Sequence, residues 1–198
     1  MERMTIEVGG YEVNCTFVVR EKKALIVDPG ADADRIVSVL RDKGWTPDAI
    51  LLTHAHFDHI GGIPGLQREF PERPVYVHPN DVPMFGHFMN QSPPDYPLAP
   101  TPKNVRDARE LKDVTVIETP GHTPGGVCYY IPEDKLLLSG DTLFAGSCGR
   151  TDFPGGSMAQ MRESLAKLMT LPGDTEVIPG HGPFTTIADE KAGNPFVQ

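Results

Sequence analysis

The chain has 198 residues, a formal net charge of -9 at pH 7 and a pI of about 5.2. This charge repels a phosphate backbone, and the sequence carries no basic cluster, which argues against a nucleic-acid partner. No apolar run is long enough to span a membrane, and neither end carries a signal peptide or a lipidation motif, so a soluble cytoplasmic protein is expected.

The composition also predicts one domain that is rich in strands and turns. The length suits a single domain spanning residues 1–198. The 20 glycines and 20 prolines indicate many tight turns, which a helical bundle rarely needs. Three cysteines are too unevenly spaced for a disulfide framework: Cys15, Cys128 and Cys148.

The first half of the chain predicts strands separated by two helices. Strands are expected at residues 11–19, 24–28, 49–53 and 75–78. Helices are expected at residues 32–44 and 60–70. The first of these helices has one side formed by Ile36, Val39, Leu40 and Lys43, and Gly44 is its expected C-cap.

The second half of the chain repeats this mixture of strands and a helix. Strands are expected at residues 114–119, 126–131, 135–141 and 175–182. Ser157 begins a helix and forms a capping box with Gln160. An apolar stripe on this helix is expected to face the core, and it consists of Met158, Met161, Leu165 and Leu168. Helices between strand groups in both halves indicate an α/β fold in layers.

Residues 92–102 read SPPDYPLAPTP and contain five prolines. The simpler interpretation is an extended surface loop, because the segment is short and proline-rich. The alternative is that this loop forms a rim over a substrate pocket.

Residues 53–62, THAHFDHIGG, place three histidines and an aspartate within six positions. In an extended backbone, positions i and i+2 point the same way, so His54 and His56 can hold one cation together. Asp58 and His59 follow in a turn and can face a second cation. Gly61 and Gly62 are expected to let the backbone bend sharply after them.

Three more candidate ligands each follow a glycine at the end of a predicted strand or in a turn. They are His122, Asp141 and His181. A lone histidine in such a place often only caps a turn, but the combination with THAHFDHIGG favours a metal site. Seven ligands with one bridging carboxylate suit two cations. His78 and His87 lack partners at ligand spacing, and we expect them to be structural or surface residues.

These motifs resemble those of the metallo-β-lactamase superfamily, in the same order along the chain. They are IVDPG (26–30), THAHFDHIGG (53–62), GHTPG (121–125), GDTLF (140–144) and GHG (180–182). The resemblance implies an αββα sandwich with the metals at the edge between its two sheets. It also implies that His54, His56 and His122 bind the first metal, that Asp58, His59 and His181 bind the second, and that Asp141 bridges them.

Within that superfamily, residues 143–157, LFAGSCGRTDFPGGS, are similar to the glyoxalase II and persulfide dioxygenase branch. The greatest similarity is to compact glyoxalase II-like hydrolases. Two features depart from glyoxalase II proper. A C-terminal helical domain that helps bind glutathione is not expected here, and HGPF at residues 181–184 lacks the usual aromatic residue directly after the last histidine.

The expected activity is hydrolysis of a small-molecule thioester such as S-lactoylglutathione. Two divalent ions would lower the pKa of a bridging water, and the resulting hydroxide would attack the carbonyl carbon while Asp58 orients it. A thiolate leaves without a proton donor, whereas an alkoxide or an amine usually needs one. Zinc is the expected metal, and iron or manganese would also suit the carboxylate-containing site.

Other activities remain open on the same motifs. One is a persulfide dioxygenase with a single iron held by two histidines and Asp141, and another is hydrolysis of a lactone or a β-lactam. A tRNA-processing nuclease is disfavoured by the acidic charge, and a non-catalytic binding module by the open metal site.

Two residues near the GRTDF segment have open roles. Arg150 could face the substrate as a cation or fix its own loop, and its alternative is a salt bridge to Asp152. Cys148 is expected to be a packed residue and not a nucleophile, because every nearby motif histidine is committed to metal.

Overall fold

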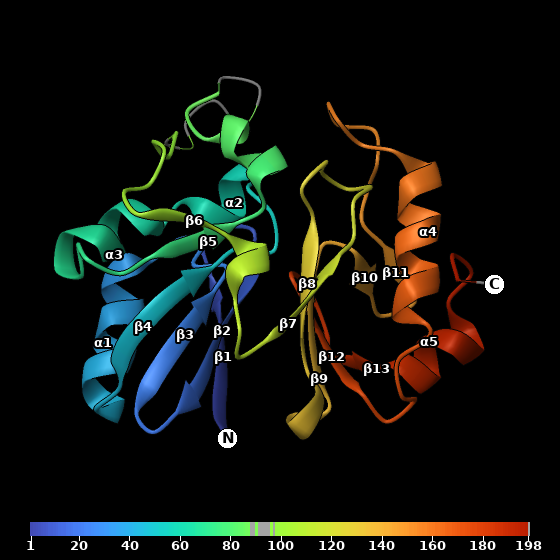
Figure 1. Ribbon diagram of the computed structural model, residues 1–198, viewed down its shortest axis with the longest axis horizontal. Helices are drawn as coiled ribbons and strands as arrows, with labels where there is room; N and C mark the ends of the chain where they lie inside the picture. Colours follow the sequence, from blue (N-terminus) through green and yellow to red (C-terminus); the bar gives the residue numbers. More distant parts are fainter. Residues whose placement is uncertain (88–89, 91–95, 97, 198) are drawn as a thin grey trace.

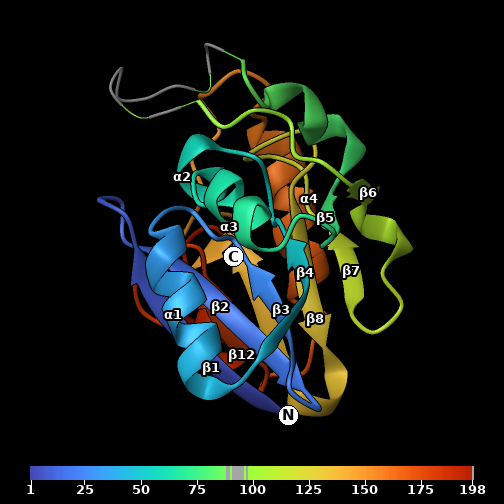
Figure 2. The same ribbon diagram turned by 90° about the vertical axis from the view of Figure 1, so that its left-hand side faces the viewer.

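Two mixed β-sheets pack face to face, and helices cover the outer face of each sheet (Figures 1 and 2). Helices α1 (Ala33–Lys43) and α3 (Ile63–Glu69) lie outside the first sheet (Figure 1). Helices α4 (Met158–Leu168) and α5 (Ile187–Gly193) lie outside the second sheet. The four layers form the αββα sandwich that the sequence predicts.

The computed structural model describes residues 1–87, 90, 96 and 98–197. Among these residues, no helix is long and apolar enough to cross a bilayer. The proline-rich segment expected at residues 92–102 lies partly outside the described residues. Of its described members, Tyr96 packs edge-on against Phe57, with the two ring centroids 4.9 Å apart.

The first sheet contains six strands in the order β1-β2-β3-β4-β5-β6. They are β1 (Glu2–Val8), β2 (Val13–Arg20), β3 (Lys23–Val27), β4 (Thr46–Leu51), β5 (Val75–Val77) and β6 (Val105–Asp107). The first three strands pair antiparallel, and the strands from β3 to β6 pair parallel. Helix α1 makes the crossover from β3 to β4, and α3 makes the crossover from β4 to β5, as parallel pairing requires.

The second sheet has five strands in the order β13-β12-β9-β8-β7. They are β7 (Thr115–Glu118), β8 (Val127–Ile131), β9 (Leu136–Gly140), β12 (Glu176–Pro179) and β13 (Thr185–Thr186). Only β9 and β12 pair parallel, and α4 makes the crossover between them. Short elements complete the chain: α2 (Phe57–Ile60), η1 (Pro79–Met84), η3 (Ala108–Glu110), η4 (Pro132–Asp134), β10 (Leu143–Phe144) and β11 (Ser147–Cys148).

Alternation along the strands divides the apolar residues among three core layers. On β8, Tyr129 and Ile131 belong to the core between the two sheets. Their neighbours Cys128 and Tyr130 belong to the core between the second sheet and its helices. A third core lies between the first sheet and α1 and α3. Because successive strand residues point to opposite faces, each sheet is buried on both sides.

Helix α1 ends as predicted but buries a slightly different side. Gly44 is its C-cap and has the left-handed conformation, with φ 62°. Ile36, Val37 and Leu40 are fully buried, whereas the predicted Val39 is only partly buried. Lys43, at the end of the same side of the helix, is exposed.

Helix α4 begins at the predicted Ser157. The Ser157 side chain accepts a hydrogen bond from the backbone N–H of Gln160 at 3.4 Å. The Ser157 N–H donates to the Gly121 carbonyl at 2.8 Å instead of to the Gln160 side chain, so only half of the capping box forms. Three of the four predicted apolar residues are fully buried: Met161, Leu165 and Leu168.

Substitution of Tyr129 by Phe should lower the free energy of unfolding by about 1–2 kcal/mol. The buried Tyr129 hydroxyl donates a 2.7 Å hydrogen bond to the Leu52 carbonyl, across the core between the sheets. Removing the donor leaves that carbonyl buried without a partner. Urea denaturation of the variant measures the effect.

Tyr130→Phe is the matched control, because the Tyr130 side chain lies on the opposite face of β8 and its hydroxyl makes no hydrogen bond with the part of the chain described. Its unfolding free energy should change by less than about 0.5 kcal/mol. Equal losses in the two variants would show that the bond to Leu52 contributes nothing specific.

Candidate metal centre

The segment after β4 carries the first four candidate ligands. His54 and His56 follow the strand in extended backbone, and their ring centroids lie 4.8 Å apart, so they point to the same place as expected. Asp58 and His59 lie within α2. All four side chains are buried, which places polar groups where only a partner can compensate for the lost water.

Gly61 and Gly62 serve close packing and not a sharp bend. Both have an ordinary right-handed helical backbone, with φ -62° and -81°, so the expected glycine-dependent bend is wrong. A Cβ atom on Gly62 would lie 2.6 Å from the Pro29 carbonyl oxygen, and one on Gly61 would lie 2.4 Å from that of Gly30. The two glycines therefore let the loop after β3 lie directly against α2.

The second sheet supplies the other three candidates. Asp141 follows β9 and His181 follows shortly after β12, and these strands are parallel neighbours. Their carboxyl ends therefore meet at one edge, and His122 reaches the same edge from the turn between β7 and β8. A Cβ atom on Gly180 would lie 2.2 Å from Asp141 Oδ1, so a glycine is needed there.

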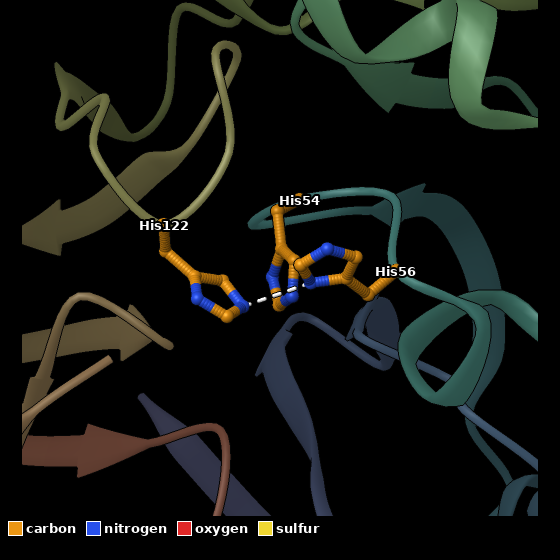
Figure 3. Close-up of side chains that lie close together, drawn as sticks. All are labelled: His54, His56 and His122. Carbon is orange, nitrogen blue, oxygen red and sulfur yellow. Dashed lines mark hydrogen bonds between the residues drawn. The ribbon is translucent and has the colours of Figure 1, made fainter. Parts of the chain in front are cut away.

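All seven candidates converge on this edge between the sheets. Their nitrogen and carboxylate oxygen atoms form three groups, each spanning no more than 4.8 Å: His54–His56–His122, His54–His59–Asp141 and Asp58–His59–His181. Figure 3 shows the first group, in which His54 and His56 come from one half of the chain and His122 from the other. His56 Nδ1 lies 2.8 Å from His122 Nε2.

Asp141 lies between the first and the last of these groups. Its Oδ2 atom is 3.4 Å from His122 Nε2, and its Oδ1 atom is 3.4 Å from His59 Nε2. In the last group, Asp58 Oδ2 lies 3.3 Å from His181 Nε2. One carboxylate with an oxygen toward each group is the arrangement that a bridging ligand requires.

Backbone carbonyls hold the outer ring nitrogens of two histidines. His122 Nδ1 donates to the Arg150 carbonyl at 2.7 Å, and His181 Nδ1 donates to the Tyr11 carbonyl at 2.8 Å. A carbonyl only accepts hydrogen bonds, so each Nδ1 carries the proton. Each Nε2 then presents its lone pair to the centre, which is the usual way that proteins orient a metal-binding histidine.

Thr53 forms a hydrogen bond with the outer nitrogen of His54, and Asp28 lies close to the outer nitrogen of His59 without a well-aligned hydrogen bond. Thr53 Oγ1 donates to Asp28 Oδ2 at 2.6 Å, and it therefore accepts from His54 Nδ1 at 3.1 Å. His59 Nδ1 lies 3.1 Å from the same Asp28 oxygen. Asp28 has a left-handed backbone, with φ 50°, which is costly for a residue other than glycine. This strain is maintained at the loop that orients both rings.

The centre fits two divalent cations. His54 Nε2 and Asp141 Oδ1 are buried and make no hydrogen bond with any described atom. Buried polar atoms are nearly always satisfied, so these two atoms indicate a missing partner. Five imidazoles and two carboxylates are a donor set suited to zinc, iron or manganese.

Two histidines of the first group, His54 and His56, are already in the protonation state that binds metal. Burial lowers the pKa of His54 well below its usual value, and the neighbouring His59 and His122 lower it further. Burial and the neighbouring His122 lower the pKa of His56 to about 3. Both rings are therefore neutral over the physiological pH range.

The last of the three groups, Asp58–His59–His181, is called the second group from here on, and it behaves in the opposite way. Burial alone would lower the pKa of His59, but the carboxylates of Asp141 and Asp58 raise it well above its usual value. The hydrogen bond with Asp58 likewise raises the pKa of His181 against the effect of burial. Burial alone would raise the pKa of both carboxyl groups, but the nearby histidines outweigh it and lower each pKa.

Asp81 is a buried residue that sequence reasoning missed. One of its oxygens accepts from the Ala55 N–H at 3.1 Å and from Thr123 Oγ1 at 2.8 Å, and the other accepts from the Gly125 N–H at 2.6 Å. Ala55 separates two candidate ligands, and Thr123 follows a third. Asp81 thus connects both loops of the first group, but no motif surrounds it in the sequence. Asp28 could have been found, because IVDPG already contained it.

Arg150 lies at the rim of the centre, among the residues that line its cavity. Its guanidinium forms two 2.7 Å hydrogen bonds with Asp152 and lies 4.0 Å from the centre of the Phe153 ring. The salt bridge considered as the alternative is therefore present. Whether Arg150 also contacts a substrate stays a prediction.

The remaining residues singled out in the sequence lie outside the three groups. Cys148 is half-buried against the core next to α4, and burial raises the pKa of its thiol, as expected for a packed residue. His78 is buried, caps η1 by accepting from the Asn80 N–H, and lies 3.2 Å from Glu118. His87 is exposed and lines a second cavity.

The family assignment comes from comparison with known proteins. The sequence pattern described as the metallo-beta-lactamase superfamily matches residues 8–181, which include all seven candidate ligands. The chain belongs to this superfamily.

Two curated relatives of this superfamily member match nearly end to end. The probable metallo-hydrolase YqgX of Bacillus subtilis is 38% identical, covering 100% of this chain and 98% of the relative. The hydroxyacylglutathione hydrolase GloC of Haemophilus influenzae is 33% identical, covering 97% of this chain and 96% of the relative. The family supports a hydrolase that acts on a small-molecule substrate.

Solved structures agree with this superfamily fold. TTHA1623 in a di-iron-bound form has a TM-score of 0.90 and 38% identity, covering 98% of this chain and 99% of that one. The B3 metallo-β-lactamase BLEG-1 has a TM-score of 0.90 and 36% identity, covering 99% of each chain. With the ligand groups described above, the di-iron neighbour supports a dinuclear metal site.

Metal bound at the second group should be lost at a higher pH than metal bound at the first. His59 and His181 have raised pKa values, so metal must displace their protons, and its affinity falls as the pH falls. His54 and His56 have lowered pKa values and hold no competing proton. After dialysis, elemental analysis should find about two ions per chain near pH 7.5 and about one near pH 5.5.

His56→Ala tests which ion is lost, because His56 belongs only to the first group. The one ion that this variant still binds should be held by the second group, and it should be lost as the pH falls from about 7.5 to about 5.5. Simultaneous loss of both ions from the wild type would contradict the assignment.

Asp81→Asn should weaken metal binding at the first group and lower the free energy of unfolding by about 1–3 kcal/mol. An amide keeps only one acceptor oxygen, so the three donors to Asp81 cannot all be satisfied. Competition with a chelator measures the metal affinity, and urea denaturation of the metal-free protein measures stability. Asp107→Asn is the control, since Asp107 is partly exposed, caps η3, pairs with Arg109 and lies outside the ligand groups. Unchanged metal affinity in Asp81→Asn would rule out this positioning role.

Proposed function

We propose that this protein hydrolyses thioesters of small molecules with two divalent metal ions at the centre. The observation that carries the proposal is the position of Asp141, with one oxygen 3.4 Å from a histidine of each outer group. A carboxylate between the two groups supports a site for two ions that act together, and it would not be needed by a single structural ion. The relative GloC, described as a hydroxyacylglutathione hydrolase, supports the thioester class.

The proposed first ion is held by three histidines, and the proposed second ion by Asp58 and two others. The residues are His54, His56 and His122 for the first, and Asp58, His59 and His181 for the second, with Asp141 shared. Bound there, two such ions supply an activated water and a Lewis acid. Zinc is the proposed metal, and iron or manganese would fit the same donors.

Asp58 is the proposed orienting residue. It is buried, its Oδ2 atom lies 3.3 Å from His181 Nε2, and its pKa stays below the usual value, so it remains an acceptor at neutral pH. A carboxylate in this state can accept a proton from an attacking water and fix its direction. Against the effect of burial, the nearby histidines also lower the pKa of Asp141, so this carboxylate stays negatively charged at neutral pH.

The cavity beside the centre favours a leaving group that needs no proton. Its described carboxylates and histidines all belong to the ligand groups, and Arg150 is paired with Asp152. Tyr11 also lines this cavity. A phenol has an ordinary pKa of about 10, which makes it a weak proton donor at neutral pH. A thiolate can leave unaided, because a thiol has a pKa of about 8.5. An alkoxide or an amine usually needs a donor. A thioester is therefore the substrate class that these residues support best.

A β-lactam is the second candidate substrate, because BLEG-1 shares 36% of its sequence with this chain and nearly its whole fold. The persulfide dioxygenase alternative needs one iron held by two histidines and Asp141. The complete second group, with Asp58 and His181 3.3 Å apart, argues against that alternative.

Thiol release from S-D-lactoylglutathione by zinc-loaded protein tests the proposed function. Wild-type protein should release thiol, and His56→Ala should reduce kcat/KM by at least about 100-fold, because it removes one ligand of the proposed first ion. His78→Asn is the control: asparagine also caps a helix, and His78 lies outside the ligand groups. The control should keep full activity.

Absence of thiol release with zinc, iron and manganese alike would contradict thioester hydrolysis. Hydrolysis of a chromogenic cephalosporin by the same preparations would then favour the β-lactam reading. Oxygen uptake with glutathione persulfide, at one iron per chain, would favour the dioxygenase.

A further inference from the structure

A second cavity, of about 270 Å³, opens beside the metal centre. Three residues line both this cavity and the one at the centre: His56, Phe57 and Phe153. Its other lining residues are Pro83, Met84, His87, Asn90 and Pro154. The two cavities are therefore neighbours, and a molecule at the metals can extend from one into the other.

The amide of Asn90 is already committed to the backbone around this cavity. Its Oδ1 atom accepts from the Phe57 N–H at 3.1 Å. Its Nδ2 atom donates to the Ala55 carbonyl at 2.7 Å and to the Met84 carbonyl at 3.1 Å. With all these bonds made, Asn90 holds the wall in place and offers little polarity to a ligand.

Charge is also missing from the described part of the cavity wall. It contains no Lys, Arg, Asp or Glu. Arg150, which borders the metal cavity, lies over the Phe153 ring and is paired with Asp152. His56 directs Nδ1 toward His122 and the metal centre. The His87 imidazole also lines the cavity, and it is exposed. Apart from these two histidines and the asparagine amide, the lining residues are Phe, Met and Pro, which favour an apolar group and disfavour a carboxylate.

The volume sets the size of the group that fits. An apolar cavity of about 150 Å³ holds one benzene molecule. The volume of about 270 Å³ is larger, but this cavity is partly open to solvent, so the part of a ligand that it encloses is about six to eight carbon atoms, as a chain or as an aromatic ring with a short linker.

We propose that this cavity binds an apolar substituent of the substrate, of about six to eight carbon atoms, while the scissile bond lies at the metal centre. The inference rests on the proposed function and defines its substrate class as thioesters with such a substituent. Either the acyl group or the thiol could carry it, and the experiment separates these two cases.

Chain-length dependence of kcat/KM tests the proposal. Acetyl, butanoyl, hexanoyl, octanoyl and decanoyl thioesters of N-acetylcysteamine vary the acyl side, and acetyl thioesters of ethanethiol and hexanethiol vary the thiol side. On the side that enters the cavity, kcat/KM should rise about 3–4-fold per methylene. The rise should stop at about eight carbon atoms. A flat series on both sides would overturn the proposal.

Met84→Gln tests whether this cavity is responsible, because glutamine keeps the approximate length of methionine but adds a polar amide. It should reduce the ratio of kcat/KM between the long and the short substrate at least about 5-fold. The control is Met169→Gln, a partly buried methionine that packs against the core beside α4, far from both cavity linings. That ratio should stay unchanged in the control, and equal changes in both variants would count against the proposal.

A binding measurement separates this inference from the proposed function. Benzyl alcohol should produce a saturable shift of the Met84 methyl resonance in wild-type protein, assigned by its absence in Met84→Gln. Binding without hydrolysis of any thioester would refute the proposed function and support the apolar site. Hydrolysis without chain-length dependence and without this shift would support the function and refute the site.

Discussion

The structure depends on one constraint, which is that buried carboxylates and imidazoles from two different sheets must compensate one another at a single edge. Asp141 comes from the second sheet, yet its oxygens lie 3.4 Å from His59 of the first sheet and from His122 of its own. Uncompensated charge would be costly at this depth. The two halves of the chain must therefore dock in one register, and the main-chain links around the centre fix it. Val13 pairs with His181, and the Asn14 side chain donates to the carbonyls of Pro179 and Gly182.

The fold also explains why the two ligand groups differ electrostatically. The group His54–His56–His122 meets one carboxylate, with Asp141 Oδ2 3.4 Å from His122 Nε2, and burial keeps at least His54 and His56 neutral. The other group gathers its histidines among carboxylates, which favours the protonated ring. One centre thus contains a site that is ready for metal and a site that must first release protons. Such an asymmetry gives two neighbouring ions different affinities without any difference in the overall fold.

Local patterns predicted much of this arrangement, and long-range packing accounts for what they missed. Strand alternation and the caps at Gly44 and Ser157 are local properties, so the main strands and both long helices were predicted. All seven residues of the predicted ligand set converge in space. The strand β1 was missed although Met4, Ile6 and Val8 alternate, because charged residues interrupt its start. Also unpredicted were β6, β13 and α5, which are short and are stabilised by their neighbours. Asp81 acts only through loops that are far away in sequence, which no local pattern encodes.

The position of the apolar cavity follows from the same architecture. The ligand histidines need backbone held on their outer sides, and Asn90 supplies part of this by binding the Ala55 carbonyl and the Phe57 N–H. Those bonds occupy the Asn90 amide, so that Phe57, Met84 and Phe153 form most of the wall next to His56, together with the His87 imidazole. The Asn90 amide and the backbone groups that it bonds are satisfied by one another, so the polar groups of the metal centre do not compete with them for partners. A ligand that spans both cavities would therefore meet charge at one end and hydrocarbon at the other, which matches a polar acyl centre joined to an apolar chain.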